Sequence, residues 1–443
     1  MTWEQLLSLK RFGDQEKRNR NEQDETRLGF DVDYDRIIFS SAFRSLQDKT
    51  QVIPLSKQDF VHTRLTHSLE VSVVGRSLGR KVGLRLLEKY PELSDLGYNF
   101  TDFGAIIAAA SLAHDIGNPP FGHSGEKAIG EFFSRGAGQA YKELLNDKQW
   151  QDLVDFEGNA NGLKLVVDGH VGGAEGIRLS YATLGAFIKY PKESLPVKPS
   201  RDIVDKKYGF FQEQSDFADE LFNDLGLKRR SENDVAFNRH PLAFLVEAAD
   251  DICYTIIDFE DGINLGWIEE DFALEYLVKI VKDKLDTKKY WAMEDKASRV
   301  AYLRAVAIGV LIEEAVDIFM ANEEAIRRGE YQIGLMDKCK FEAQINDIIN
   351  ISVNKIYRSQ TVVEKEVAGY KVIHDLLKVF LGATINKDVS NYSKLILTLI
   401  PGLKSISKLE DSYLKIINTC SLIAGMSDGQ AIDLHKKVSG LQI

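Results

Sequence analysis

Apolar side chains recur along most of this chain at the spacing of an α-helix. Leu69, Val73 and Leu78 follow this pattern, and so do the apolar residues of 245–257 and 301–319. Alternation of apolar and polar residues, which indicates half-buried strands, is scarce. The pattern predicts an all-α fold, in which functional side chains project from helices or from the loops that join them.

The length of 443 residues allows two or three domains of roughly 100 to 200 residues each. We expect an N-terminal arm over residues 1–35, a main body over 36–265 and a second helical region over 266–443. Glycine and proline are frequent near 157–199, which predicts an insertion within the main body.

The formal net charge of -11 argues against a nucleic-acid-binding surface over the whole molecule, but it is compatible with a local basic pocket for a polyanion. The chain has an odd number of cysteines that lie far apart in the sequence: Cys253, Cys339 and Cys420. This pattern favours a reducing cytoplasm over a disulfide framework. Residues 1–20 lack the apolar core of a signal peptide, and no apolar run approaches about 18 residues. We therefore expect no membrane span.

Reactive side chains are concentrated in AHDIGNPPFGHSGE, residues 113–126. The apolar run before this stretch predicts a buried helix that ends at His114 and Asp115, because a helix cannot continue through the two prolines that follow. His123 and Glu126 come next, three residues apart, and so share one face of the following helix. Two imidazoles and two carboxylates in this short stretch indicate a functional site.

A metal site is predicted from His67, His114, Asp115 and Asp250. Each lies on or at the end of a predicted buried helix, where a helical bundle supplies its ligands. Two imidazoles and two carboxylates suit a borderline divalent ion such as Mn, Fe, Co or Zn. Taken singly, a histidine on an apolar helix is more often a hydrogen-bonded core residue, and only the combination favours the metal.

The order of these four residues resembles the HD-domain metal-dependent phosphohydrolases. Five blocks resemble, more narrowly, the deoxyguanosine triphosphate triphosphohydrolases (dGTPases): RLTHSLEV, AHDIGNPPFGHSGE, FEGNAN, YATLGAFIKYP and RHPLAFLVEAADDICYTIIDFEDG. The resemblance covers about residues 27–265, and VEKEVAGYKVI near Val363 is the best match beyond it.

The resemblance implies an HD-domain helical bundle over 36–265, followed by a C-terminal helical region. It also implies hydrolysis of dGTP to deoxyguanosine and inorganic triphosphate, with Mn²⁺ or Mg²⁺ as the divalent cofactor. Proteins that resemble this chain form homo-oligomers, commonly hexamers or tetramers, so we expect an oligomer here.

The spacing of His123 and Glu126 lets the carboxylate bond the imidazole, an arrangement typical of a general acid or base. A structural histidine with a helix-capping glutamate is the alternative. By resemblance His123 and Glu126 are the catalytic pair, and Asp115 also helps to position water.

Asp250, Tyr254 and Asp258 fall at i, i+4 and i+8 and so share one helix face. The resemblance implies that Tyr254 packs against the sugar and leaves no room for a 2′-hydroxyl. It implies that Asp258 accepts a hydrogen bond from the 3′-hydroxyl. Taken alone, the tyrosine would more often be a core residue.

Further substrate contacts follow mainly from the resemblance. Arg64 lies three residues before His67 and shares its face, which aims a guanidinium at phosphates near the metal. Lys189 and Tyr190 correspond to phosphate-side contacts, Gln51 and Val52 to contacts with the base, and Asn159 to a residue of the same cavity. His170, in the glycine-rich loop, has no assigned role.

Three alternatives to a dGTPase remain at this stage: another HD-domain nucleotide phosphohydrolase, a dNTPase of broad specificity, and a non-catalytic sensor of nucleotides or single-stranded DNA. Single-stranded DNA is also a candidate effector, and a solvated arm is the alternative explanation for the basic residues on which this idea depends. These residues are Lys10, Arg11, Lys17, Arg18 and Arg20.

Overall fold

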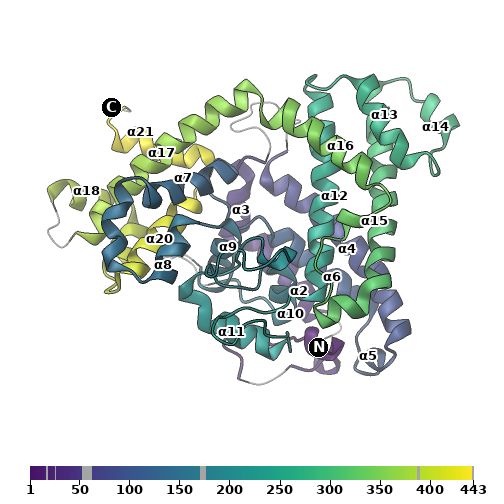
Figure 1. The fold of residues 1–443 in the computed structure, drawn as a ribbon, viewed down its shortest axis with the longest axis horizontal. Helices are drawn as coiled ribbons and strands as arrows, with labels where there is room; N and C mark the ends of the chain where they lie inside the picture. Colours follow the sequence, from purple (N-terminus) through teal and green to yellow (C-terminus); the bar gives the residue numbers. More distant parts are fainter. Residues whose placement is uncertain (16–17, 25, 52–61, 170–175, 387–389, 442–443) are drawn as a thin grey trace.

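The computed structural model describes residues 1–443 except 16–17, 25, 52–61, 170–175, 387–389 and 442–443 (Figure 1). The described residues are mainly helical, and their extended pairing is limited to isolated bridges such as that between Arg11 and Ser180. The predicted all-α fold is therefore confirmed. None of the described helices combines the length and the apolar character needed to cross a lipid bilayer.

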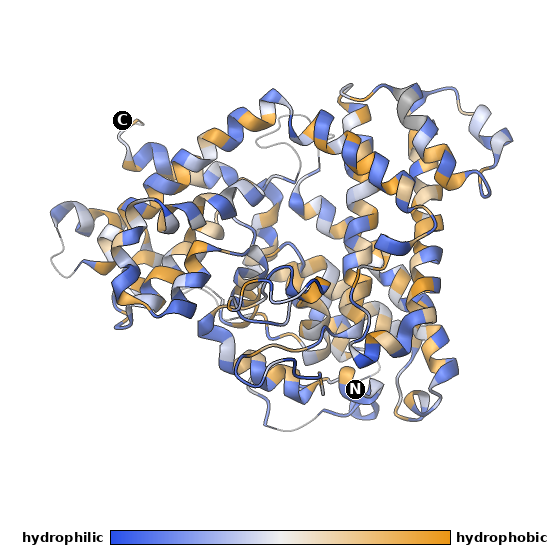
Figure 2. Ribbon diagram, in the orientation of Figure 1, coloured by the Kyte–Doolittle hydropathy of each residue, from blue (hydrophilic) through white to orange (hydrophobic). Residues whose placement is uncertain are grey.

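Helices of the larger hydrophobic cluster occupy the right-hand side and the centre of Figure 1. Orange apolar faces of these helices turn toward one another in Figure 2. The helices of this part are α1 (Trp3–Leu6), α2 (Gly29–Phe39), α3 (Ser41–Arg44), α4 (Arg64–Lys89), α5 (Glu92–Asp95), α6 (Phe100–Ala113), α10 (Tyr181–Phe187), α11 (Ser215–Asp224), α12 (Pro241–Asn264), α13 (Glu270–Val281), α14 (Thr287–Trp291), α15 (Lys296–Arg328) and α16 (Glu342–Ser352).

A second hydrophobic cluster lies on the left of Figure 1. It joins the helices that follow the HD dipeptide to the C-terminal helices, and α9 contributes to both clusters. Both clusters contain residues from either side of residue 265. The domain boundaries at 35 and 265 stay predictions. The helices of this part are α7 (Gly122–Ser134), α8 (Asp147–Val154), α9 (Gly158–Val167), α17 (Gln360–Ile385), α18 (Asn391–Leu399), α19 (Pro401–Ser407), α20 (Ser412–Ala424) and α21 (Asp428–Val438).

The helix that carries His67 packs closely on the buried helix α6. An ideal Cβ built at Gly79 of α4 would lie 2.6 Å from the carbonyl oxygen of Phe103, so only glycine allows this approach. The buried residues of α4 include Gly75, Gly79 and Gly83 as well as larger side chains such as Leu78. Of the apolar residues that indicate this helix in the sequence, Leu78 is buried, whereas Leu69 and Val73 are 37% and 52% exposed. The apolar pattern located the helix correctly, but it did not reveal that glycines of α4 are buried against α6.

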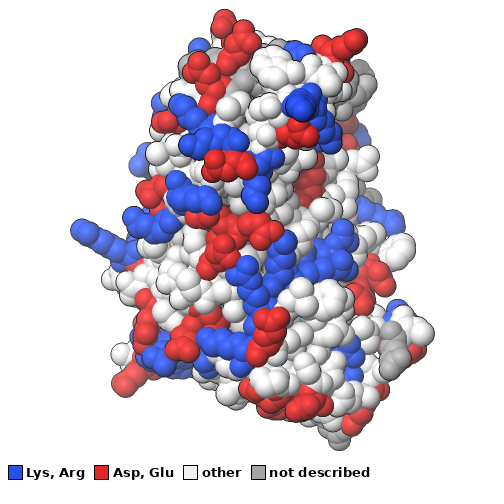
Figure 3. All heavy atoms as spheres, turned by 90° about the vertical axis from the view of Figure 1, so that its right-hand side faces the viewer, with Lys and Arg blue, Asp and Glu red and all other residues white. Residues whose placement is uncertain are grey.

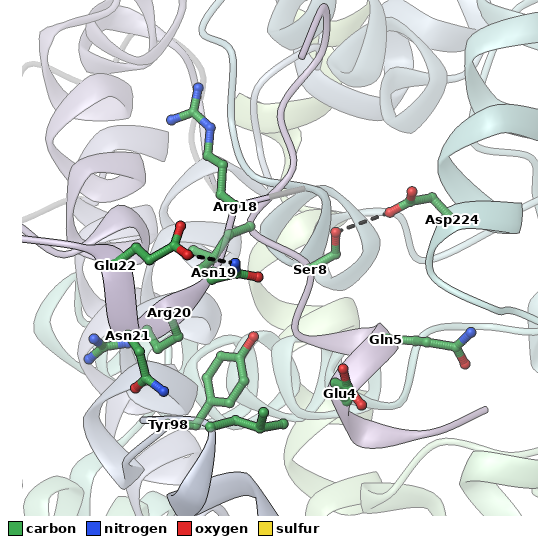
Figure 4. Close-up of a pocket in the computed structure, with 12 residues that line it drawn as sticks. Glu4, Gln5, Ser8, Arg18, Asn19, Arg20, Asn21, Glu22, Tyr98 and Asp224 are labelled. Atoms are coloured by element: carbon green, nitrogen blue, oxygen red, sulfur yellow. Dashed lines mark hydrogen bonds between the residues drawn. The ribbon is translucent and has the colours of Figure 1, made fainter. Parts of the chain in front are cut away.

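The N-terminal segment is docked on the main body. Trp3 and Leu6 are buried, and the indole Nε1 of Trp3 donates to Glu323 at 2.8 Å. A polar hollow of about 270 Å³ lies where this segment meets the body (Figure 4). In this hollow Ser8 donates to Asp224 at 3.0 Å and Asn19 donates to Glu22 at 2.9 Å.

Most of the basic residues considered for single-stranded DNA are already paired. Their acidic partners reduce the positive charge that would be available to bind single-stranded DNA. Lys17 lies outside the described residues. The pairs are Lys10 with Glu220, Arg11 with Asp33, Arg18 with Asp14 and Arg20 with Asp102. Figure 3 shows acidic and basic side chains interspersed over the face it presents. The DNA prediction itself remains untested.

Candidate active site

One cavity of about 560 Å³ collects most of the predicted site residues. Its walls come from α4, α12, the loop between α6 and α7, and the C-terminal segment around α17. The predicted residues that line it are Gln51, Arg64, His67, His114, Asp115, His123, Asn159, Lys189, Tyr190, Asp250 and Tyr254. Glu126 and Asp258 lie behind this lining, and Val52 falls outside the described residues.

Three of the four predicted metal ligands form a cluster in this cavity, and the fourth, Asp250, lies beside the two histidines. One donor atom each from His67, His114 and Asp115 lies within 4.8 Å of the others. Oδ1 of Asp250 lies 3.2 Å from Nε2 of His67 and 3.5 Å from Nε2 of His114. The donors come from α4, the end of α6 and α12, which are far apart in the chain.

Hydrogen bonds around the site turn its donor atoms inward. Nδ1 of His114 lies 2.7 Å from the carbonyl oxygen of Ser111, which fixes the proton on Nδ1 and leaves the lone pair on Nε2. Oδ1 of Asp115 accepts from Arg64 at 2.7 Å and from Asn118 at 2.6 Å. The other oxygen of Asp115 is buried without a hydrogen-bond partner, as expected of an atom reserved for a cation. The residues therefore fit a divalent ion.

Nearby charges keep two buried acids of the site, Asp115 and Asp250, ionised. Burial alone would raise the pKa of Asp115, but the Arg64 guanidinium and the neighbouring imidazoles hold it below its usual value. Burial likewise opposes ionisation of Asp250, yet Lys189, 2.7 Å away, is the largest influence holding the pKa of this carboxyl well below its usual range. Both carboxylates are thus available as ligands at neutral pH.

His123 and Glu126 form the predicted pair on α7. Nδ1 of His123 lies 2.7 Å from Oε2 of Glu126, and the His123 side chain is 73% exposed. Glu126 is buried, and its other oxygen accepts from the backbone nitrogen of Gly158 at 2.8 Å. Burial would raise the pKa of Glu126, but the bond from His123 and the charge of Lys207 lower it. The carboxylate therefore orients the imidazole through Nδ1, and the ring of His123 lines the cavity.

The α12 face continues from the metal ligands into an aromatic wall. The ring of Tyr254 stacks on Tyr357, with centroids 5.8 Å apart and planes 3° from parallel. The Tyr357 hydroxyl donates to one oxygen of Asp258, and the other oxygen of this buried carboxylate has no partner. Burial raises the pKa of Asp258 to about 7. Asp258 is thus held by Tyr357, and its contact with a 3′-hydroxyl stays a prediction.

Gln51, Asn159 and Tyr190 are the remaining predicted residues that line the cavity. The side-chain oxygen of Gln51 is buried without a partner, while the amide of Asn159 donates to Glu157 at 2.6 Å. Tyr190 follows Lys189, whose carbonyl oxygen accepts from Arg239 at 2.6 Å. His170 and residues 171–175 of the glycine-rich loop lie outside the described residues.

Several lining residues were not predicted from the sequence. Lys207 pairs with Glu157 at 2.8 Å and lines the cavity together with Lys206. The adjacent lysines in DKKYGF were the available signal for this basic wall. Tyr357 and Glu366 come from the C-terminal region. Glu366 lies within the block VEKEVAGYKVI, whereas no local pattern marks Tyr357 as part of a site.

Part of the chain matches a known protein family. Residues 64–154 match the HD domain family, and this range contains His67, the HD dipeptide and the His123–Glu126 pair. Fold and site together define an HD-domain protein.

Full-length relatives narrow the class. A deoxyguanosinetriphosphate triphosphohydrolase-like protein of Synechocystis is 40% identical over the whole of both chains, and one of Pseudomonas aeruginosa is 36% identical over 99% of both. A deoxyguanosinetriphosphate triphosphohydrolase of Yersinia pestis is 30% identical over 85% of this chain and 81% of its own. The chain belongs to the deoxyguanosinetriphosphate triphosphohydrolase family.

Proposed function

We propose that this protein hydrolyses dGTP to deoxyguanosine and inorganic triphosphate. The observation that carries the proposal is that the four metal-ligand candidates and the exposed ring of His123 line the same cavity. Its volume of about 560 Å³ is within the range of small-molecule sites. The names of relatives that are 30% to 40% identical support dGTP as the substrate.

His67, His114, Asp115 and Asp250 would hold the divalent cation, for which we propose Mn²⁺ or Mg²⁺. The bound ion would supply Lewis acidity at the α-phosphate and lower the pKa of water. Two imidazoles in the donor set favour Mn²⁺ of the two, because Mg²⁺ prefers oxygen ligands alone.

The chain's own residues would then position the substrate and move the proton. Arg64 and Lys189 are each fixed by one carboxylate, and their remaining N–H groups are available to the triphosphate at little cost of reorganisation. Nε2 of His123, when protonated, would donate to the departing 5′-oxygen. Glu126 would stabilise the protonated ring and keep it oriented.

The other end of the cavity suits a purine deoxynucleoside. The side-chain oxygen of Gln51, which has no hydrogen-bond partner, can accept from a purine N–H. This bond would offset the free-energy cost of burying the oxygen unpaired. The stacked rings of Tyr254 and Tyr357 form a flat wall that we assign to the sugar.

Product analysis tests this proposal. Purified protein is incubated with each of the four dNTPs and Mn²⁺, and the products are separated by chromatography. We expect deoxyguanosine and intact triphosphate from dGTP, with slower turnover of the other three. Equal turnover of all four would instead identify a broad dNTPase, and release of phosphate or pyrophosphate would identify another phosphohydrolase.

We also propose that the protein is a cytoplasmic homo-oligomer, a hexamer or a tetramer. Exposed apolar residues at helical spacing support subunit contacts: Tyr392, Leu395 and Leu399 on α18 are each at least 50% exposed. The three cysteines are buried free thiols, which supports a reducing compartment. Light scattering of the purified protein measures the oligomer size.

A further inference from the structure

The end of α20 and the start of α21 form hydrogen bonds with two segments that border the active-site cavity. Asp428, the first residue of α21, is 1% exposed and lies 307 positions after Phe121 in the sequence. Its Oδ1 accepts from the backbone nitrogen of Phe121 at 3.0 Å. Its Oδ2 accepts from the backbone nitrogen of Thr50 at 3.2 Å and also from the Thr50 hydroxyl. One carboxylate thus joins the loop before α7 to the segment that carries Gln51.

Lys49 makes a second connection between the same parts. Its side chain is 2% exposed, and Nζ donates to the carbonyl oxygens of Asn118 at 2.6 Å and Ala424 at 2.7 Å. Burial lowers the pKa of Lys49 to about 7, and the amine can donate to both carbonyls whether or not it is charged. The carbonyl oxygen of Lys49 accepts from the backbone nitrogen of Arg64 at 3.1 Å, which extends the connection to the start of α4.

The loop held by these contacts has a backbone conformation that needs support. Phe121 has φ of +63°, in the left-handed region that a residue with a side chain rarely adopts, and Gly122 follows with φ of +59°. Such a conformation is strained for a residue with a side chain and persists only when its surroundings impose it. Because α7 begins at Gly122, this turn sets the direction in which His123 leaves the loop.

We propose that Asp428 and Lys49 are positioning residues that hold the base-side segment at Thr50–Gln51 and the turn at Phe121 in register with each other. The proposal rests on the proposed function, because it assigns these segments to the base and to the general acid. Neither side chain needs to touch substrate. Their effect on the reaction is exerted through Gln51 on one side and His123 on the other.

Asp428→Asn tests the proposal, with Asp433→Asn on the same helix as the matched control. Asn has the size of Asp, but its amide nitrogen cannot accept the hydrogen bond that one of the two segments donates. The Asp433 carboxylate is 63% exposed and lies 3.9 Å from Lys436. We expect kcat/KM for dGTP to fall about 10- to 100-fold in Asp428→Asn, since misplacing a catalytic group by about 1 Å costs ~10²-fold. Asp433→Asn should match the wild type.

Two readouts separate positioning from a general loss of stability. A smaller folded fraction would lower turnover of every dNTP by the same factor, whereas a displaced Gln51 changes the ratio of kcat/KM between dGTP and dATP. Amide hydrogen exchange should also become faster in peptides covering residues 49–51 and 118–122, and not elsewhere. An unchanged dGTP to dATP ratio together with unchanged exchange in these peptides would overturn the proposal.

Lys49→Met provides a second variant if Asp428→Asn does not fold. Met has a similar length but leaves both carbonyl oxygens without their donor, so the same two readouts should change. If the wild type hydrolyses no dNTP, the proposed function has failed, while the exchange measurement still decides whether the two residues hold these segments.

Discussion

At the scale of the residue, the surroundings of His123 suit it for proton transfer. Its ring is exposed to the cavity on one side and bonded to a buried carboxylate on the other. We expect His123→Ala to lower kcat by about 10² to 10⁴, the usual share of general acid–base catalysis, with a smaller change in KM. His435→Ala, which removes an imidazole from the Asp375 pair outside the cavity, is the control and should keep wild-type kcat. A His123→Ala protein with near-normal turnover would rule out the assigned role.

The stacked pair of Tyr254 and Tyr357 leads to a prediction about sugar selection. Tyr254→Ala removes one ring and opens space beside the sugar, so GTP should be accepted more readily. We expect the preference for dGTP over GTP to fall by about 10- to 200-fold, the range for steric discrimination in a pocket. Steady-state kinetics with both nucleotides measures this ratio. A ratio equal to that of the wild type would mean that this wall does not select the sugar.

Sequence alone located most of the site because its residues occur in short blocks with strong local patterns. His114, Asp115, His123 and Glu126 lie within one such block, and the structure brings them to the predicted cavity or directly behind it. Tyr357 could not be found in this way. It lies on a π-helical turn (Val353–Tyr357) in the C-terminal region, and only tertiary packing brings it to Tyr254.

At the scale of the element, the contact of α7 and its preceding turn with α17 determines how the C-terminal region closes the cavity. An ideal Cβ at Gly369 of α17 would lie 2.6 Å from the buried ring of Phe121, whereas one at Gly382 of the same helix would meet no atom within 4 Å. We expect Gly369→Ala to destabilise the protein by about 1 to 3 kcal/mol through overpacking. Gly382→Ala should be neutral or stabilising by up to about 1 kcal/mol, because alanine favours the helix.

Denaturant unfolding of both variants measures these changes, and turnover provides a second readout. Because the Phe121 turn precedes His123, Gly369→Ala should also lower kcat, while Gly382→Ala should not. Equal stability of the two variants would contradict the close packing of Phe121 on α17.

Helix positions were easier to predict than helix faces. The apolar pattern correctly placed α4, α6 and α12, because apolar spacing and helix-ending prolines are local signals. It did not show which side of α4 is buried, and Leu69 and Val73 of this pattern are exposed. The structure instead buries glycines of α4 against α6, since the gain from close backbone packing depends on a partner helix that the local pattern does not reveal.

At the scale of the whole molecule, a buried acid beside the second hydrophobic cluster makes the stability of the fold depend on pH. Asp152 on α8 accepts from the hydroxyl of Tyr413 on α20 at 2.5 Å and from the backbone nitrogen of Gln212 at 2.8 Å. Burial raises the pKa of Asp152 from 3.8 to about 7. Between these two values the unfolded chain has released the proton and the folded chain has kept it. Stability is therefore lost as the pH rises from about 4 to about 7.

Asp152→Asn removes this ionisation while an amide oxygen can still accept both hydrogen bonds. We expect the variant to gain stability relative to the wild type as the pH increases, by about 1 to 3 kcal/mol more at pH 8 than at pH 5. Thermal unfolding of both proteins across this range measures the difference. A difference that does not vary with pH would show that Asp152 does not titrate there.

The proposed reaction requires that water attack the α-phosphorus of dGTP in this cavity. Hydrolysis in H₂¹⁸O tests this directly, with the label located by mass spectrometry of both products. Attack at the α-phosphorus predicts deoxyguanosine without label and inorganic triphosphate that carries one ¹⁸O atom. Label in the nucleoside, or release of dGMP with pyrophosphate, would contradict the account.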